Sequence, residues 1–511
     1  MTFPRTALIV AMGLGFAVTA GDPAIFSSDL PDIARELGMT ASQSGTLASV
    51  ATLVIAATIL AAGSFGDRWG KVRLFRIGLI AGMLFAVAGA VAPNAPVLVA
   101  ARVGAGAAFA VLLGLSLAIV NAAFPGEDRP RAIGSYLSVA FLAGAPMVLL
   151  GGVLTQALSW RASLLVTAVY CAAGLLLLIR MPETPTSSQR IDVPGLVLAA
   201  VMLVCIVYGV GLVTAAPVIG VGLVAVGAAA GAVFVIVEKR SSSPALDLSV
   251  FRSRTFTLAV AAGGSFNLLT GGFTLVLSYY LVVVEGNSTV VFGLVVLVAS
   301  VAQAVGANIA GRLTTSAGPR LPLLLGLASL VASCGVFAMT RLDSGLVMPL
   351  LGFTLLALGN AFVQTPQSTL MMAAAGSERG GSVSAVKSGT GQAFYSLGPA
   401  VFTLLVVSIY TSRSGSALQS HGISAEQARA VLQPLLSGTA GQVGGPGLAD
   451  PALVETVVGV ASSSFVDAMR LTSVLAAIVP LGVGLAMVFL LPRGRARHAA
   501  AAQHEVRGGG A

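Results

Sequence analysis

The sequence predicts an all-α polytopic membrane protein, and three observations support this fold class. Of the 511 residues, 56% are apolar and only 9% are charged, and the mean hydropathy is +0.95. Soluble proteins, in contrast, carry about 25% charged residues. Apolar stretches also recur along most of the chain, and each is long enough to cross a bilayer core of about 30 Å, which needs roughly 20 helical residues. Finally, the lysine and arginine residues are concentrated in every second connection between these stretches, as in proteins that cross the membrane many times.

Fourteen membrane-spanning helices are predicted in order along the chain. The two weakest divisions are near Pro217 and Pro319, where the connecting loops are very short. The expected spans are 7–28, 43–64, 74–93, 96–124, 132–156, 162–181, 193–213, 217–238, 256–284, 289–312, 319–340, 346–375, 384–410 and 468–491.

The distribution of charge predicts the orientation of these spans. Most of the 28 Lys and Arg residues fall in every second loop and in the two tails. The positive-inside rule places those segments in the cytoplasm. An even number of spans then puts both termini on the cytoplasmic side of the plasma membrane. The net charge of +9 is explained by topology, and no basic soluble surface suggests nucleic-acid binding.

The reactive side chains argue against metal or disulfide chemistry. Cys171, Cys205 and Cys334 all lie in apolar runs, where small buried thiols are expected. The three histidines lie in polar segments. We therefore expect no metal site and no bound cofactor. The sequence also lacks a complete Walker A motif, which argues against direct ATP drive.

A carboxylate in the first span is the most unusual feature of the chain. Asp22 lies in "TAGDPAIFSSDLPDI", within or just beyond span 7–28, and Pro23 follows it. A charge at bilayer depth costs at least about 2.5 kcal/mol, so such a group is expected to have a function. Pro23 predicts a broken or kinked helix that lines a cavity. The alternative is that the span ends near Ala20 and that Asp22 is already in water.

A glycine-rich basic loop joins spans two and three. In "GSFGDRWGKVRLFR" the glycines permit close backbone approach, and Asp67 can accept charge-assisted hydrogen bonds. The loop resembles the signature G-x-L-x-D-R-x-G-R-K of the major facilitator superfamily of secondary transporters. The residues that carry this resemblance, together with the neighbouring base Arg73, are Gly63, Gly66, Asp67, Arg68, Gly70, Lys71 and Arg73.

Further segments resemble the fourteen-span drug:proton antiporters of that superfamily. "LLGGVLTQALSWR" is similar to their helix-packing segment after span five, and the packing candidates are Gly144, Pro146, Gly151 and Gly152. "GRLTTSAGPR" at 311–320 looks like a degenerate second copy of the signature loop, as a parallel internal repeat would leave.

This resemblance implies the domain organisation of the chain. It implies two six-helix bundles with two additional helices between them: an N-terminal bundle at 1–192, the additional helices and a cytoplasmic linker at 193–254, and a C-terminal bundle at 255–492. The last bundle contains an extracytoplasmic loop at 412–467, within which "AEQARAVLQPLL" could form a short amphipathic helix. A cytoplasmic tail follows at 493–511.

The resemblance, together with the positions of the polar groups, indicates which residues act in transport. Asp22, Leu30 and Pro31 fit the pattern L-D-x-T-x-x-N-x-A-L-P of the first helix, whereas Ala24, Ser27 and Asp29 depart from it. Proton-coupling candidates are Asp22, Arg102, Asp29 and Glu285, and Arg102 is assigned as the only cation within a span. Snorkelling remains the alternative role for Arg102, and a wet helix end the alternative for Glu285. Candidates for lining the substrate path are Phe16, Phe26, Gln364, Gln367 and Gln392. The alternative role is core packing for the phenylalanines and hydrogen bonding between helices for the glutamines.

The expected function is proton-driven export of lipophilic or cationic drug-like compounds by alternating access, from a monomer surrounded by lipid, with the proton gradient as the energy source. One alternative is an exporter of a single endogenous metabolite, lipid or peptide. Another is a membrane scaffold or sensor that does not transport. An enzyme is not expected, because the spans contain no evident catalytic cluster.

Overall fold

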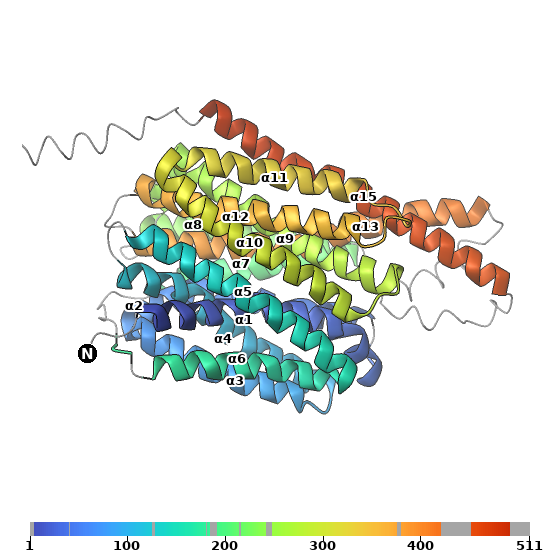
Figure 1. The fold of residues 1–511 in the computed structure, drawn as a ribbon, viewed down its shortest axis with the longest axis horizontal. Helices are drawn as coiled ribbons and strands as arrows, with labels where there is room; N and C mark the ends of the chain where they lie inside the picture. The colour runs from blue at the N-terminus through green and yellow to red at the C-terminus, as the bar shows by residue number, and fades with distance from the viewer. Residues whose placement is uncertain are drawn as a thin grey trace, which may run out of the picture.

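A computed structural model describes most of the chain. The described residues are 5–39, 41–124, 128–179, 181–183, 192–213, 216–241, 248–375, 380–420 and 451–490. Within these ranges the chain is almost entirely helical and contains no strand. The long helices lie side by side (Figure 1).

The first six long helices form one half of the molecule. They are α1 (Arg5–Glu36), α2 (Ala41–Trp69), α3 (Lys71–Ala90), α4 (Ala95–Ala123), α5 (Asp128–Ala157) and α6 (Trp160–Leu178). Helix α1 packs against α5, α6 and α4, and α3 packs against α4 and α6.

The last six long helices repeat this arrangement. They are α9 (Arg254–Tyr279), which continues as the π-helical turn η2 (Tyr280–Val284), then α10 (Thr289–Ala317), α11 (Arg320–Ala338), α12 (Val347–Ala375), α13 (Gly380–Ser420) and α15 (Pro451–Leu490). Here α9 packs against α13 and α12, and α11 packs against α12 and α15. The two halves meet along two seams, α5 against α10 and α2 against α13.

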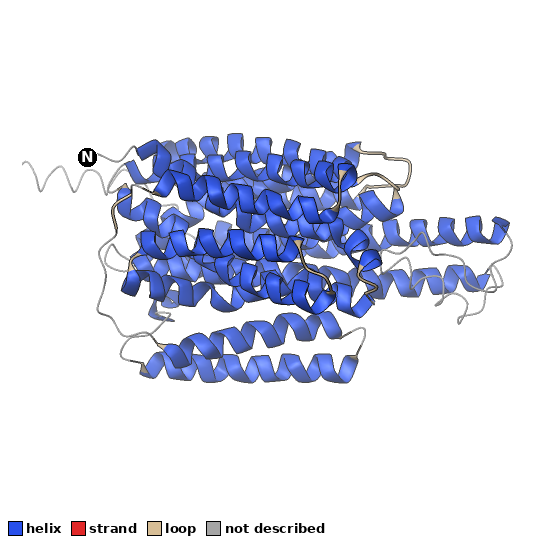
Figure 2. Cartoon of the chain, turned by 90° about the horizontal axis from the view of Figure 1, so that it is seen from below, coloured by secondary structure: helices blue, strands red, loops and turns tan. Residues whose placement is uncertain are grey.

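A helical hairpin separates the halves in sequence. It consists of α7 (Val193–Leu212) and α8 (Pro217–Arg240), and a short 3-10 helix, η1 (Leu248–Arg252), follows it. The two helices pack on each other, and α7 contacts α2 and α13. Figure 2 shows a pair of helices lying along one side of the molecule.

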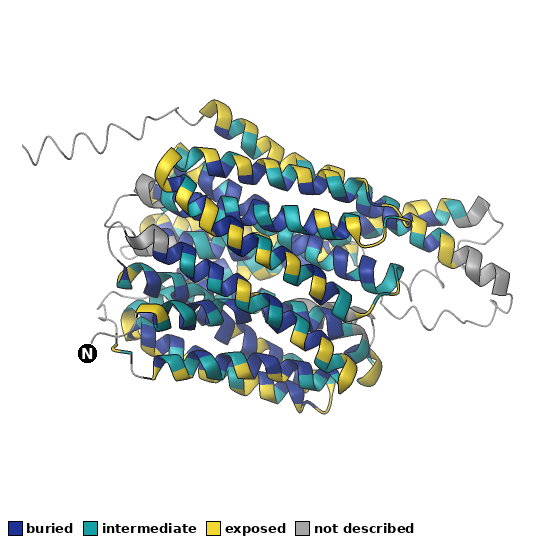
Figure 3. Ribbon diagram, in the orientation of Figure 1, coloured by how far each residue is buried: buried dark blue, intermediate teal, exposed yellow. Residues whose placement is uncertain are grey.

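The predicted spans agree with the helices of the structure. Thirteen helices among the described residues are long and apolar enough to cross a membrane. A fourteenth span is provided by α2, in which Val50–Ile59 and Ala61–Trp69 meet at 54°. Large apolar side chains on the outside of the bundle, such as Leu176, Val218 and Phe489, are exposed as they would be to lipid (Figure 3).

Two expectations about helix boundaries are wrong. The expected break of α1 at Pro23 is not found, because the helix continues from Arg5 to Glu36 and is held by contacts with α4, α5 and α6. The other form of that expectation, a kink at Pro23, stays a prediction. Helical structure also enters the expected loop 412–467 from both ends, since α13 runs to Ser420 and α15 starts at Pro451. These two helices extend beyond the others at one end (Figures 1 and 2). The segment "AEQARAVLQPLL" lies outside the described residues.

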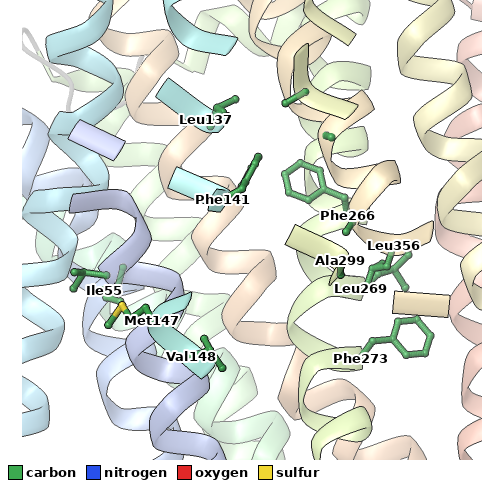
Figure 4. Packing of buried hydrophobic residues seen from close by; sticks show 14 of the residues in the cluster. Ile55, Leu137, Phe141, Met147, Val148, Phe266, Leu269, Phe273, Ala299 and Leu356 are labelled. Carbon is green, nitrogen blue, oxygen red and sulfur yellow. The ribbon is translucent and has the colours of Figure 1, made fainter. Parts of the chain in front are cut away.

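The apolar core continues across the boundary between the halves. Side chains of α5, including Phe141 and Val148, face Phe266 of α9 and Ala299 of α10 (Figure 4). Polar bridges occur in the same region: Nδ2 of Asn308 donates to Oγ of Ser138 at 2.6 Å. The contact surface between the halves therefore combines apolar packing with single neutral hydrogen bonds.

Candidate functional site

The carboxylate in the first span lies deep in the N-terminal half. Asp22 of α1 is 1% exposed, so the alternative in which it is already in water is wrong. Its Oδ1 lies 2.6 Å from Nη1 of Arg102 on α4, and its Oδ2 accepts a hydrogen bond from Thr167 of α6 at 2.7 Å. Three helices therefore meet at one carboxylate.

Arg102 is buried with its partner and does not snorkel. It is 4% exposed, and its guanidinium carbon lies 4.2 Å from the centroid of the Phe26 ring. Phe26 thus packs in the core under the guanidinium, 1% exposed, beside a cation that favours the face of an aromatic ring. Within the described residues, no hydrogen bond reaches Nε of Arg102. The ion pair is nearly dry, which strengthens the attraction between the two charges and makes the loss of either one costly.

A second carboxylate, Asp29, lies two turns further along α1. It is fully buried, and its surroundings differ from those of Asp22. Oδ1 accepts a hydrogen bond from Thr155 of α5 at 2.8 Å, and Oδ2 accepts one from Ser163 of α6. The hydroxyl of Ser28 is 3.5 Å from Oδ1. Asp22 and Asp29 are seven residues apart and their partners on α6 are four apart, so both acids face the α1–α6 contact.

The end of the bundle beyond Asp29 is closed by a polar cluster. Glu36 pairs with Arg161 and accepts a hydrogen bond from the indole of Trp160. The Arg161 guanidinium stacks over the Trp160 ring at 4.2 Å and donates to the carbonyl of Ala92. This cluster ties the end of α1 to the start of α6 and to the turn before α4.

The remaining proton-coupling candidate lies apart from these acids. Glu285 follows the π-helical turn η2 and is half-buried. It accepts a hydrogen bond from the hydroxyl of Tyr280 at 2.8 Å. Its hydrogen-bond partner belongs to its own helix, as expected for a group that fixes a helix end.

Sequence reasoning missed one cation. Lys387 lies on α13 and donates a hydrogen bond to the hydroxyl of Ser368 on α12. The assignment of Arg102 as the only cation within a span is therefore wrong, since the span that contains Lys387 begins at Val386. The signal was available, because Lys387 falls within the predicted span 384–410.

The signature loop forms a one-residue turn between two helices. Gly70 separates α2 from α3 with φ of +93°, a conformation that favours glycine. Asp67 pairs with Lys71 across this turn, whereas Arg68 and Arg73 are exposed. A Cβ on Gly66 would lie 2.4 Å from Leu115 of α4, but one on Gly63 would meet open space. The loop thus holds α2 and α3 close to α4.

The degenerate second copy has the same geometry in the C-terminal half. Gly318 and Pro319 separate α10 from α11, and Gly318 has a φ of +81°. Nη2 of Arg320 donates to the carbonyl of Val488 on α15 at 2.9 Å. In the first half, Arg76 of α3 likewise donates to the carbonyl of Leu178 on α6. Equivalent helices of the two halves are therefore joined in equivalent ways.

The packing candidates lie where α5 meets α1. A Cβ on Gly151 would come within 2.7 Å of Ile25, and one on Gly144 would come within 4.0 Å of Ala17. Pro146 lies inside α5, and Gly152 is buried. Of Gly144 and Gly151, Gly151 therefore has the less room for a side chain.

The lining candidates occupy different surroundings. Phe16 contacts the rings of Tyr136 and Phe141 edge-on. Gln367 is 3% exposed, and its amide lies against Gly263 of α9. Gln392 is buried and Gln364 is half-buried. The structure places Phe16 in the N-terminal half and the three glutamines in the C-terminal half, whereas Phe26 belongs to the Arg102 site.

Two repeated six-helix halves, many membrane spans and an ion pair buried between helices define a polytopic helical membrane protein with an internal repeat. The sequence matches the Major Facilitator Superfamily over residues 12–399, and the chain belongs to that family. It is therefore a transporter by family and fold, and the resemblance of the loop at 63–76 to the family signature is confirmed.

Similar proteins include several named for drug resistance. The multidrug resistance protein Stp of Mycobacterium tuberculosis is 31% identical over 395 residues, which cover 75% of this chain and 73% of Stp. The multidrug efflux pump LfrA of Mycolicibacterium smegmatis is 28% identical over 93% of this chain and 95% of its own. A solved bacterial homologue of the human lysosomal transporter Spinster has a TM-score of 0.58 at 17% identity, covering 96% of this chain and 98% of its own. The last likeness concerns the fold alone.

Proposed function

We propose that this protein exports lipophilic or cationic drug-like compounds in exchange for protons, by alternating access across the plasma membrane. The buried ion pair between Asp22 and Arg102 is the observation that carries the proposal. Relatives named as multidrug resistance and efflux proteins, Stp and LfrA among them, support the substrate class. We further propose that the chain acts as a monomer with both termini in the cytoplasm and uses the proton gradient without a bound cofactor.

The ion pair links protonation to helix packing. While Asp22 is charged, its carboxylate attracts the Arg102 guanidinium and holds α1 against α4. A proton on Asp22 removes that attraction, because a neutral acid no longer balances the cation. The contact between α1 and α4 then weakens, which favours a different arrangement of the helices. A cationic compound that arrives near the carboxylate favours its charged form and so expels the proton.

The test is transport by purified protein in liposomes. A proton gradient is imposed, ethidium is supplied as a lipophilic cation, and ethidium movement and proton release are recorded together. We expect wild type to exchange protons for ethidium and Asp22→Asn to lose both fluxes. Asp32→Asn is a matched control, since Asp32 lies on the same helix but forms a largely exposed pair with Arg35.

The other outcomes distinguish the alternatives. Ethidium-driven proton flux that survives in Asp22→Asn would contradict coupling at this carboxylate. A wild-type protein that moves neither ethidium nor any other compound of a lipophilic panel would contradict the proposed substrate class. That result would favour an exporter of one endogenous compound or a scaffold that does not transport.

A further inference from the structure

The second carboxylate of α1 has a feature that the ion pair lacks. Each hydroxyl around Asp29 has another acceptor within reach in its own helix. Thr155 Oγ1 lies 3.1 Å from the carbonyl oxygen of Gly151, and Ser163 Oγ lies 2.7 Å from that of Trp160. Ser28 Oγ lies 2.7 Å from the carbonyl oxygen of Ile25.

This arrangement satisfies both protonation states of the acid. When Asp29 is ionised, the hydroxyls of Thr155 and Ser163 turn their protons toward its oxygens. When Asp29 is neutral, the hydroxyl beside the protonated oxygen can donate to its own carbonyl and accept the acid's proton with a lone pair, while the other hydroxyl continues to donate to the unprotonated oxygen. Rotation about side-chain bonds is enough to convert one state into the other, and neither state leaves a buried polar atom without a partner.

The charges around Asp29 do not hold it in the ionised form. Its described partners are three hydroxyls, and the nearest interacting charge is another carboxylate, Asp32. The cations of the adjoining helices are engaged elsewhere: Arg102 of α4 pairs with Asp22, and Arg161 of α6 pairs with Glu36. On α1 itself, Arg35 pairs with Asp32. Burying an ionised carboxylate without a counter-ion is costly, so the closed site favours a bound proton.

A short polar route connects Asp29 with one end face of the bundle. Ser163 is less than one turn from Trp160, whose indole donates to the exposed Glu36. Asp29 and Glu36 are seven residues apart, which is about 10 Å along a helix. In the proposed topology this face is extracytoplasmic, the side from which protons enter.

We propose that Asp29 is a second proton-binding group of the transport cycle, loaded from the face that carries Glu36, Trp160 and Arg161. The proposal rests on the proposed proton-coupled export and adds a group to it. Water at that face supplies the proton, which binds an oxygen of the Asp29 carboxylate. The proton leaves for the opposite side when the helices rearrange. In this scheme the Asp22–Arg102 pair couples protonation to the packing of α1 against α4. Asp29 binds a second proton and forms no ion pair.

Infrared difference spectroscopy tests the proton site without any transport. The detergent-solubilised full chain is titrated, and the carboxylic acid band is followed through the pH range. We expect one titrating component of this band in wild type that is absent in Asp29→Asn and retained in both Asp22→Asn and Asp32→Asn. The pair Thr155→Val and Ser163→Ala should shift the pH at which the band disappears, because it removes two hydroxyls that contact the carboxylate. A band that is unchanged in Asp29→Asn would overturn the proposal.

Stoichiometry tests the role of the proton in transport. In liposomes, the protons exchanged per ethidium should fall by one in Asp29→Asn and stay at the wild-type value in Asp32→Asn. An unchanged ratio in Asp29→Asn, in a protein that still exports ethidium, would overturn the second site and leave the proposed function intact. If wild type shows no exchange at all, the proposed function fails, and the infrared titration alone decides whether Asp29 binds a proton.

Discussion

The two halves of the molecule share a scaffold but differ in the chemistry of their interiors. In α1 to α6 the buried polar groups include Asp22, Asp29 and Arg102. In the described parts of α9 to α15 the buried polar groups are uncharged amides and hydroxyls, including Gln367 and Gln392. The comparison teaches that the repeat preserves helix packing while, among the described residues of the two halves, fully buried charged side chains occur only in the first half; Lys387 and Glu285 of the second half are half-buried.

The shared scaffold makes this contrast informative. Gly70 and Gly318 provide positive-φ glycines in equivalent short turns, and Arg76 and Arg320 cap equivalent helices. Since the connections correspond, the differing interiors reflect residue type and not a different fold. Substitutions at corresponding places can therefore separate scaffold effects from charge effects.

The largest effect is expected from removing the buried cation. Arg102→Met leaves the Asp22 carboxylate buried without its partner, which should lower the free energy of unfolding by about 3–5 kcal/mol. Gln367→Met in the other half removes an amide whose Oε1 lacks a partner among the described residues, and should cost no more than about 1 kcal/mol. Thermal unfolding in detergent measures both. Adding Asp22→Asn to Arg102→Met should restore stability, and a failure to do so would show that charge is not the cause.

A smaller effect is expected from adding methyl groups at the contact between the first and fifth helices of each half. A Cβ on Gly271 of α9 would lie 2.3 Å from the backbone oxygen of Tyr395, which cannot move aside. A Cβ on Gly151 of α5 would meet the Ile25 side chain, which can rotate. We expect Gly271→Ala to cost about 3 kcal/mol and Gly151→Ala about 1 kcal/mol. Equal melting temperatures for the two variants would contradict this difference in packing.

The capping arginines should differ by a smaller margin. Arg76 donates to the carbonyls of Leu178 and Met181 and pairs with Glu183, whereas Arg320 has one described carbonyl partner, on Val488. Arg76→Gln should therefore cost about 2 kcal/mol and Arg320→Gln about 1 kcal/mol. Denaturation in mixed detergent and the yield of folded protein provide the measurement. A larger loss for Arg320→Gln would reverse the expected order.

The smallest effect is expected at the exposed carboxylate of α1. Asp32 pairs with Arg35 at 3.1 Å, and the two side chains are 41% and 71% exposed to solvent. Asp32→Asn should change the free energy of unfolding by less than about 0.5 kcal/mol. Ethidium transport should match wild type. A marked loss of ethidium transport in Asp32→Asn would show that Asp32 contributes to transport together with the buried acids of α1. The expected difference between buried and solvent-exposed carboxylates would then be wrong.

The spans could be predicted from the sequence because the hydropathy and the length of a stretch both follow from the need to cross the apolar interior of the bilayer. Each apolar stretch must satisfy its backbone within one helix in order to cross lipid. The helix ends were less accessible to prediction. Outside the bilayer the requirement for apolar residues ends while helix formation can continue, and so α13 and α15 run past their spans. Pro23 removes one backbone donor, but contacts with three helices keep α1 continuous.

The acids could be singled out from the sequence, but their partners could not. Asp22 and Asp29 stand out as charges in or beside a span, whereas the pairing of Asp22 with Arg102 depends on how α1 and α4 are rotated and aligned. The hydroxyls of Thr155, Ser163 and Thr167 are ordinary residues in an apolar segment. Only the packing of α5 and α6 on α1 brings them to the carboxylates.

The position of α7 has a consequence for molecules dissolved in the membrane. The halves meet at two seams, and α7 contacts the helices of only one of them, α2 and α13. A compound that diffuses in the bilayer meets the hairpin before it reaches that seam. At the seam between α5 and α10, none of the described contacts places α7 or α8 in its way. The two lateral approaches from lipid to the centre of this protein are therefore unequal, although the two halves that form them are built alike.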